Sequence, residues 1–148
     1  MSLDVYLTYK VPMRVPAGRV IPIREDGRMK HITYEEWCER YPDRAPFTVE
    51  ADEHTVFTAN ITHNLNNMAD EAGLYKYLWR PDELDITEAW QLLEPLRVGL
   101  AILEADPDRF RAFNPANGWG DYEGLVDFVC EYLNACAQYP KAEVSVWR

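Results

Sequence analysis

Hydrophobic and polar residues alternate at both ends of the chain. Residues 3–9 place an apolar or aromatic side chain at every second position, and residues 142–147 alternate in the same way. A period of two is typical of a strand with one buried face. Because unpaired strands would leave exposed edges, we expect the two terminal strands to pair in one sheet. Residues 46–51 and 54–61 also have an extended pattern.

A hairpin and a short helix are expected after the first strand. Within residues 19–32, two short extended runs flank an Asp-Gly pair at 26–27, which is a strong signal for a two-residue hairpin turn. The arms of this hairpin are basic. Thr33 and Glu36 form a capping-box pattern, which predicts a helix over Tyr34–Arg40.

Three longer helices follow from a period of 3.6 residues in the second half of the chain. The first begins near Leu65. The second is expected to be capped by Thr87 and to bury Trp90, and Pro95 would kink it if it were helical throughout. Asp121 is expected to cap the third.

The order of elements is strands, then helices, then a strand. That order predicts an α+β fold with a small antiparallel sheet, its N- and C-terminal strands paired, covered by three to four helices. A chain of 148 residues with 47% hydrophobic side chains is long enough for one packed core. We therefore expect a single α+β domain over residues 1–148, with a strand and hairpin region over residues 10–53 and the core of the domain over residues 54–148.

The net charge of −10 is unevenly distributed, with a balance of +3 in residues 1–30 and −13 in residues 31–148. Such acidity opposes direct binding of nucleic acid, whose phosphates require cationic partners. No apolar run approaches the ~18 residues of a membrane helix, and the N-terminus has no secretory-signal pattern. Three cysteines without close spacing are typical of reduced thiols. The sequence therefore predicts a cytoplasmic protein that does not bind membranes.

Few residues fit a known catalytic pattern. The chain has no Walker loop and no G-x-S-x-G, and its three histidines lack metal-ligand spacing, so neither a metal nor a cofactor is expected. His63 is the best candidate for a general acid or base because its neighbours are polar. One alternative is thus a small enzyme that uses His63 on a phosphoester or glycosidic bond.

Two segments interrupt the apolar pattern with polar residues. Residues 60–67 supply four Asn, a Thr and a His at a strand-to-helix junction. Residues 114–122 form a loop in which Trp119 stands between two glycines. Helix capping would account for one or two residues of the first segment, and Trp119 is either a plug of the core or a rigid wall for a ligand.

If the two segments meet, they form a pocket in which amides give directional hydrogen bonds and aromatic rings stack on the ligand. That combination suits a small polar or nucleotide-like ligand. A third hypothesis is an acidic inhibitor that binds another protein or mimics DNA through its helical face, and a homo-oligomer is left open. The expected ligand-binding residues are Asn60, Thr62, His63, Asn64, Asn67, Trp79, Arg80, Asn114, Asn117, Trp119 and Tyr122.

The blocks TANITHNL (58–65), LWRPDEL (78–84) and FNPANGWGDYE (113–123) resemble a family of small, functionally uncharacterised proteins encoded largely by bacteriophages and prophages. Many members carry a Cys-rich, zinc-ribbon-like insert after the first strand. Residues 10–53 contain only Cys38 and the basic hairpin, so a metal role does not carry over. The resemblance implies a phage accessory protein in an infected or lysogenic bacterial host, for which sequestering a nucleotide immune signal or blocking a host factor are two concrete roles.

Overall fold

The structure, a computed structural model, describes residues 1–11, 20–43 and 52–148. The chain divides into two compact units, each described by itself below. Unit 1 consists of residues 1–9 and 54–148, and unit 2 of residues 10–53. The extended segment expected over residues 46–51 lies outside the described residues, and the single-domain organisation of the whole chain stays a prediction.

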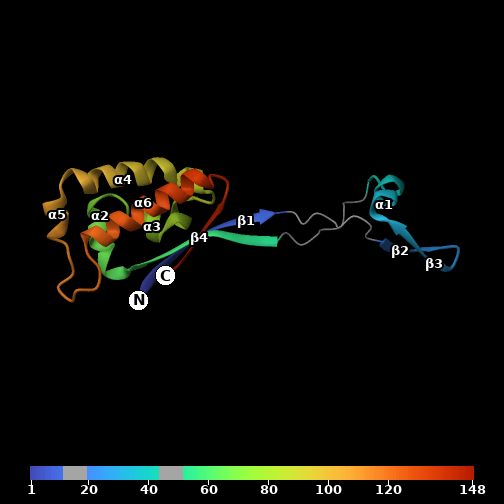
Figure 1. The fold of residues 1–148 in the computed structure, drawn as a ribbon, viewed down its shortest axis with the longest axis horizontal. Coiled ribbons are helices and arrows are strands. Elements are labelled where there is room, and N and C mark those ends of the chain that lie inside the picture. The colour runs from blue at the N-terminus through green and yellow to red at the C-terminus, as the bar shows by residue number, and fades with distance from the viewer. Residues whose placement is uncertain (12–19, 44–51) are drawn as a thin grey trace. The chain divides into compact units, whose positions relative to one another are not determined.

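Unit 1 is built on a three-stranded antiparallel sheet in the order β4–β1–β5 (Figure 1). Its strands are β1 (Ser2–Val11), β4 (Asp52–Thr62) and β5 (Glu143–Trp147). The first and last strands of the chain are therefore neighbours, which confirms the predicted pairing of the termini.

The register of β1 and β5 places the aliphatic side chains of both strands on the same face of the sheet. Val5 lies opposite Val146, and Leu7 lies opposite Val144. Directly opposite residues share a face and successive residues alternate between faces, so these four side chains point into the core while Trp147 points to the other face. The alternation in the sequence is thus the direct cause of this register.

Helices cover one face of this sheet (Figure 1), which confirms the α+β fold class. No helix formed by the described residues is both long enough and apolar enough to cross a membrane. In chain order the helical elements of unit 1 are η1 (His63–Leu65), α2 (Asn66–Glu71), α3 (Tyr75–Trp79), η2 (Pro81–Leu84), η3 (Ala89–Leu92), α4 (Leu93–Ala105), α5 (Pro107–Arg111) and α6 (Tyr122–Gln138).

The core of unit 1 lies between the sheet and the helices. Leu3 of β1, Leu96 of α4 and Val129 of α6 are fully buried there. Phe57 of β4 stacks on Tyr132 of α6, with ring centroids 5.6 Å apart. Burial of such side chains is worth about 1.5–3 kcal/mol each, so α4 and α6 are held to the sheet mainly by apolar contact.

The start of the second long helix differs from the prediction. Glu88, not Thr87, is the cap: the Gln91 side chain accepts the Glu88 N–H at 2.9 Å, and the Gln91 N–H donates to the Glu88 backbone carbonyl at 3.1 Å. The 3-10 turn η3 precedes α4, so Pro95 lies in the first turn of α4, where a missing N–H removes no helical bond. Trp90 was expected in the core but is 51% exposed.

Of the other two long helices, one begins as predicted and one is divided in two. Asp121 caps α6, since its Oδ1 accepts the N–H of Gly124 at 2.7 Å. The helix expected from Leu65 onward is interrupted at Gly73, whose φ of +74° ends α2 before α3 begins. These boundaries fix where the loop before α6 and the junction after β4 lie.

Unit 2 contains the predicted hairpin and helix, namely β2 (Val20–Glu25), β3 (Arg28–Thr33) and α1 (Tyr34–Arg40). Asp26 and Gly27 both have positive φ in the two-residue turn, as a twisted hairpin requires. The cap of α1 is formed by the Thr33 hydroxyl, which accepts from a backbone N–H at 3.1 Å. Ile21, Ile32 and Trp37 make a small core of their own.

Candidate functional site

The 60–67 junction and the 114–122 loop meet at Gly120. A Cβ atom on Gly120 would stand 2.6 Å from Cγ2 of Thr62 and 3.0 Å from Cδ1 of Leu65. The φ of Gly120 is +90°, a conformation that residues with a side chain rarely adopt. Both the space and the backbone at this contact therefore require glycine, and two segments far apart in the sequence lie together in the fold.

The loop presents Trp119 to solvent. Its side chain is 70% exposed, so the alternative of a core plug is wrong. Oδ1 of Asn117 accepts the backbone N–H of Trp119 at 3.0 Å, and Gly118 has a φ of +74°. The chain between α5 and α6 extends beyond the helices in Figure 1. The turn is thus fixed by its own hydrogen bond and glycines while the indole ring remains outside.

The base of the loop is anchored in the helices. Oδ1 of Asn114 accepts the N–H of Tyr122 at 2.8 Å, and the Tyr122 hydroxyl donates to the carbonyl of Leu103 at 2.8 Å. The Tyr122 side chain is buried, which raises the pKa of its phenol, and the guanidinium of Arg111 lies 5.1 Å from its ring centroid. Asn114 and Tyr122, both expected to contact a ligand, instead hold the loop in place.

His63 is bound on both ring nitrogens. Its Nδ1 accepts the indole N–H of Trp79 at 3.1 Å, so the network assigns the ring proton to Nε2, which lies 2.8 Å from the carbonyl oxygen of Ser2. Its backbone N–H also donates to the carbonyl of Met1 at 3.3 Å. His63 therefore joins the start of β1, the end of β4 and α3, and a substrate would have to displace one of these bonds.

Trp79 belongs to the core and not to a ligand wall. Its side chain is only 2% exposed, and Tyr75 stacks on it with ring centroids 5.6 Å apart. Its carbonyl accepts from Arg148 at 2.7 Å. The neighbouring Arg80 is half-buried, hydrogen bonding with Tyr75 raises its pKa, and it lies 3.9 Å from the carboxylate of Glu83.

Asn60 lies on the sheet face opposite the core. Its Nδ2 donates to Oδ1 of Asp4 at 2.6 Å, and Asp4 is opposite Trp147 in the β1–β5 register. These three residues form a row across three strands, a width of about 10 Å. Trp147 is 72% exposed and was not among the expected site residues. The signal was present in the sequence, because inward Val144 and Val146 leave Trp147 facing outward.

The remaining polar residues of the junction are divided between capping and the surface. The Thr62 hydroxyl accepts the N–H of Asn64 at 3.3 Å and caps η1, as the capping interpretation expects. Asn64 and Asn67 are exposed. We call the combined area the loop–sheet surface, and define it by Asp4, Asn60, Thr62, Asn64, Asn67, Asn117, Trp119 and Trp147.

Two hollows in the described surface of unit 1 are lined by other residues. One, of about 280 Å³, lies between η2 and β5. There Arg148 binds both carboxylate oxygens of Asp82, at 3.1 and 3.0 Å, and its hydrogen bonds hold the Asp82 pKa below the usual value. The other, of about 310 Å³, lies between β4 and α6. Neither hollow is lined by the loop–sheet surface.

In the comparisons with known proteins, no family model, no curated protein and no solved structure matches this chain. Function must therefore be inferred from the geometry and charge of the described residues.

Proposed function

We propose that the chain is an acidic protein-binding module that docks on a partner protein through the loop–sheet surface, with Trp119 as its anchor. The exposure of Trp119 on a prefixed turn is the observation that supports this most directly. Tryptophan is enriched among the residues that dominate binding energy at interfaces. Because Asn117 and Gly120 hold the turn before binding, little conformational entropy would be lost on docking.

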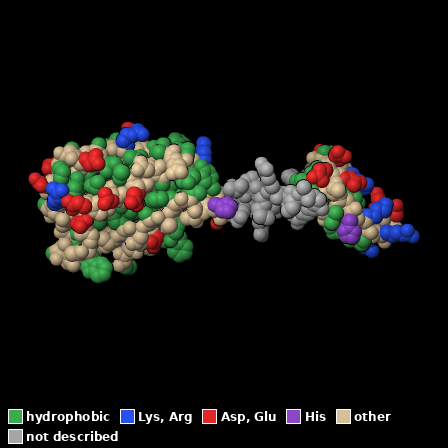
Figure 2. Space-filling view, in the orientation of Figure 1, with side chains coloured by type: hydrophobic (Ala, Val, Ile, Leu, Met, Phe, Trp, Pro, Cys, Tyr) green, Lys and Arg blue, Asp and Glu red, His purple; other side chains and the backbone are tan. Residues whose placement is uncertain are grey.

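The net charge of unit 1 indicates the sign of the charge expected on the partner. Unit 1 has sixteen acidic and seven basic side chains, a net charge of −9, and the face seen in Figure 2 shows more acidic than basic side chains. Its basic groups are largely neutralised by ion pairs, which involve Arg80, Arg97, Arg109, Arg111, Lys141 and Arg148. A partner with a net positive charge and an apolar pocket for Trp119 would be attracted to unit 1.

The resemblance to phage-encoded proteins gives this binding a biological setting. In an infected or lysogenic bacterium, the partner would be a host protein, and occupation of its surface would block its function. Association driven partly by charge would be fast and would weaken as salt rises.

The experiment is affinity capture with three forms of the full chain. Wild type, Trp119→Ala and Trp90→Ala are immobilised and exposed to an extract of the cells in which the chain is naturally made. Trp90 is the matched control because it is also an exposed tryptophan, on η3. Wild type and Trp90→Ala should retain the same protein, less of it at high salt, and Trp119→Ala should lose it. Equal retention by Trp119→Ala, or no retained protein at all, contradicts the proposal.

A second candidate function is binding of a small nucleotide-like ligand on the same surface. It is favoured by the exposed amides of Asn64, Asn67 and Asn117 in the two segments that meet beside the exposed indole of Trp119. Stacking on an aromatic ring and hydrogen bonding to amides is how single bases are recognised. Mass spectrometry of small molecules that co-purify with the native chain, before and after addition of cell extract, tests this function.

Acid–base catalysis by His63 is not favoured by the geometry. The ring already accepts from Trp79 and lies within hydrogen-bond distance of the Ser2 carbonyl. A catalytic role would need one of these bonds to open before the ring could reach a substrate.

A further inference from the structure

The strand β4 forms one edge of the sheet in unit 1. The His63 N–H points to the carbonyl of Met1, and in an antiparallel ladder residues alternate between facing the neighbour and facing away. The backbone groups of Thr58 and Asn60 therefore face away from β1. Between Thr55 and Thr62, no residue that the structure describes bonds to this outer edge through its backbone.

The opposite edge of the same sheet, formed by β5, is bonded to another segment of the chain. The N–H of Val144 donates to the carbonyl of Thr87 at 2.9 Å, and the N–H of Ala89 donates to the carbonyl of Ala142 at 2.9 Å. The segment before α4 thus covers the first part of the outer edge of β5, up to Val144. The backbone of the chain thus bonds to the edge formed by β5, whereas the described residues form no such bonds to the edge formed by β4.

The composition of the uncovered edge is permissive for strand addition. Residues 55–62, TVFTANIT, contain no charged residue and no proline, although 27% of the chain is charged. Natural proteins usually protect a free edge with lysine, proline or a bulge. This edge carries β-branched and aromatic side chains instead, which are the residues that pair best across strands.

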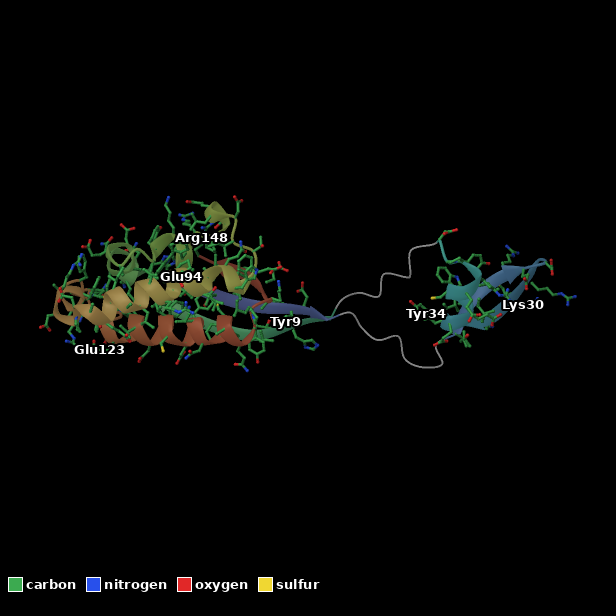
Figure 3. The ribbon with its side chains drawn as sticks, turned by 90° about the horizontal axis from the view of Figure 1, so that it is seen from above. Tyr9, Lys30, Tyr34, Glu94, Glu123 and Arg148 are labelled. Atoms are coloured by element: carbon green, nitrogen blue, oxygen red, sulfur yellow. The ribbon has the colours of Figure 1, made fainter. Side chains whose placement is uncertain are left out.

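A groove accompanies this edge. The hollow of about 310 Å³ lies between β4 and α6, and Figures 1 and 3 show α6 running alongside the strand. A strand edge with a helix as its wall is the arrangement by which domains bind an extended peptide as an additional strand. The lining residues are Val56, Phe57, Glu131, Asn134, Ala135, Gln138 and Tyr139.

Charge decides the class of occupant. Glu131 lines the groove and takes part in no ion pair among the described residues, and Asp127 lies one turn earlier on the exposed side of α6. A second copy would bring another unit of charge −9 to the same edge, which is unfavourable. A peptide with a lysine or arginine would neutralise Glu131 instead.

We infer that the groove binds an extended segment of a partner protein, which adds a fourth strand beside β4. Its backbone pairs with Thr58 and Asn60. One of its basic side chains faces Glu131, and an apolar side chain contacts Phe57 and Ala135. This site shares only Asn60 with the loop–sheet surface, through the backbone of that residue, and does not depend on the function proposed for Trp119.

The test uses a capped eight-residue peptide of alternating valine and lysine, added to the full chain. Amide hydrogen exchange is measured by NMR, and exchange at Thr58 and Asn60 should slow on binding. The same peptide with every second backbone nitrogen methylated keeps its charge but cannot complete the strand bonds, and should give no protection. A valine–glutamate peptide should not bind. Equal protection by the methylated peptide, or unchanged exchange at saturating peptide, overturns the inference.

Variants of the chain supply the matched control. Glu131→Gln should weaken binding about two- to fivefold, the range expected for one exposed ion pair. Asp127→Asn removes an equal charge from the same helix outside the groove and should have a smaller effect. Thr58→Pro removes an outward N–H at an edge that tolerates proline and should abolish binding without a change in melting temperature. If the chain alone self-associates and protects the β4 amides, a second copy fills the edge and the inference is wrong.

Discussion

Trp79 donates its indole N–H to Nδ1 of His63 across 3.1 Å, and this bond determines the state of the histidine ring. Because Nδ1 is an acceptor, the proton lies on Nε2 and is donated to Ser2. His63 therefore serves to fasten three elements of unit 1 together.

Replacement of His63 tests this structural role. In His63→Ala the buried N–H of Trp79 loses its acceptor, and the free energy of unfolding should fall by about 1–3 kcal/mol. His31→Ala, at an exposed position on β3, is the control and should change it by less than about 0.5 kcal/mol. Urea denaturation measures both. A His63→Ala variant as stable as the wild type would show that the bond has no structural weight.

Two tryptophans should respond to alanine in opposite ways. Trp119→Ala removes a side chain that is 70% exposed, so the unfolding free energy should change by no more than about 1 kcal/mol. Trp79→Ala removes one that is 2% exposed and should cost about 3–5 kcal/mol. Guanidinium denaturation distinguishes the two. A large loss from Trp119→Ala would mean that the ring is buried in solution.

Alanine substitutions at two glycines of the loop distinguish the cost of backbone strain from the cost of a packing clash. Both have positive φ, but a Cβ on Gly118 meets no atom within 4 Å, whereas one on Gly120 meets Thr62 at 2.6 Å. Gly118→Ala should therefore cost about 1–2 kcal/mol from backbone strain alone. Gly120→Ala should cost about 1–3 kcal/mol more, because the loop must move off the junction. Equal losses in thermal denaturation would show that the two segments are not in contact.

The sequence was sufficient for the pairing of the two terminal strands and for the caps of two helices. The alternation over residues 3–9 and 142–147 determines which side chains share a face of each strand. Because the apolar face of both strands must be buried in the same core, the two terminal strands pair in one register. Local polar signals at Thr33 and Asp121 act within one turn, so they could be found without knowledge of the fold. Where two candidates adjoin, as at Thr87 and Glu88, the pattern alone did not decide between them.

The candidate site was less predictable, because contacts between distant segments decide which of its residues are buried and which are exposed. Trp79 and Trp119 both looked suitable for stacking, yet one is buried against Tyr75 and the other lies outside. Nothing local to His63 indicates that its partners are a residue on α3 and a carbonyl on β1. Those assignments depend on packing between distant segments, which periodicity does not encode.

Alkaline pH should destabilise unit 1 through a buried thiol. Burial raises the pKa of Cys136 from 9.0 to about 12, and burial raises the pKa of Tyr132 as well. Because the thiol loses its proton more easily in the unfolded chain than in the folded one, its contribution to the free energy of unfolding is complete below pH 9. That contribution is lost as pH rises toward 12. Cys136→Ala should lessen the fall in unfolding free energy between pH 9 and 12, measured by urea denaturation. Cys130→Ala, at an exposed position on the same helix, is the control and should leave the fall unchanged.

Hydroxyl-radical footprinting of the tryptophans tests the central claim most directly. In the free protein, Trp119, Trp147 and Trp90 should be oxidised readily and Trp79 should not, in keeping with their exposed fractions. After addition of the captured partner, Trp119 should become protected while Trp90 remains as reactive as before. Oxidation of Trp119 that is unchanged in the complex would contradict its role as the anchor of the loop–sheet surface.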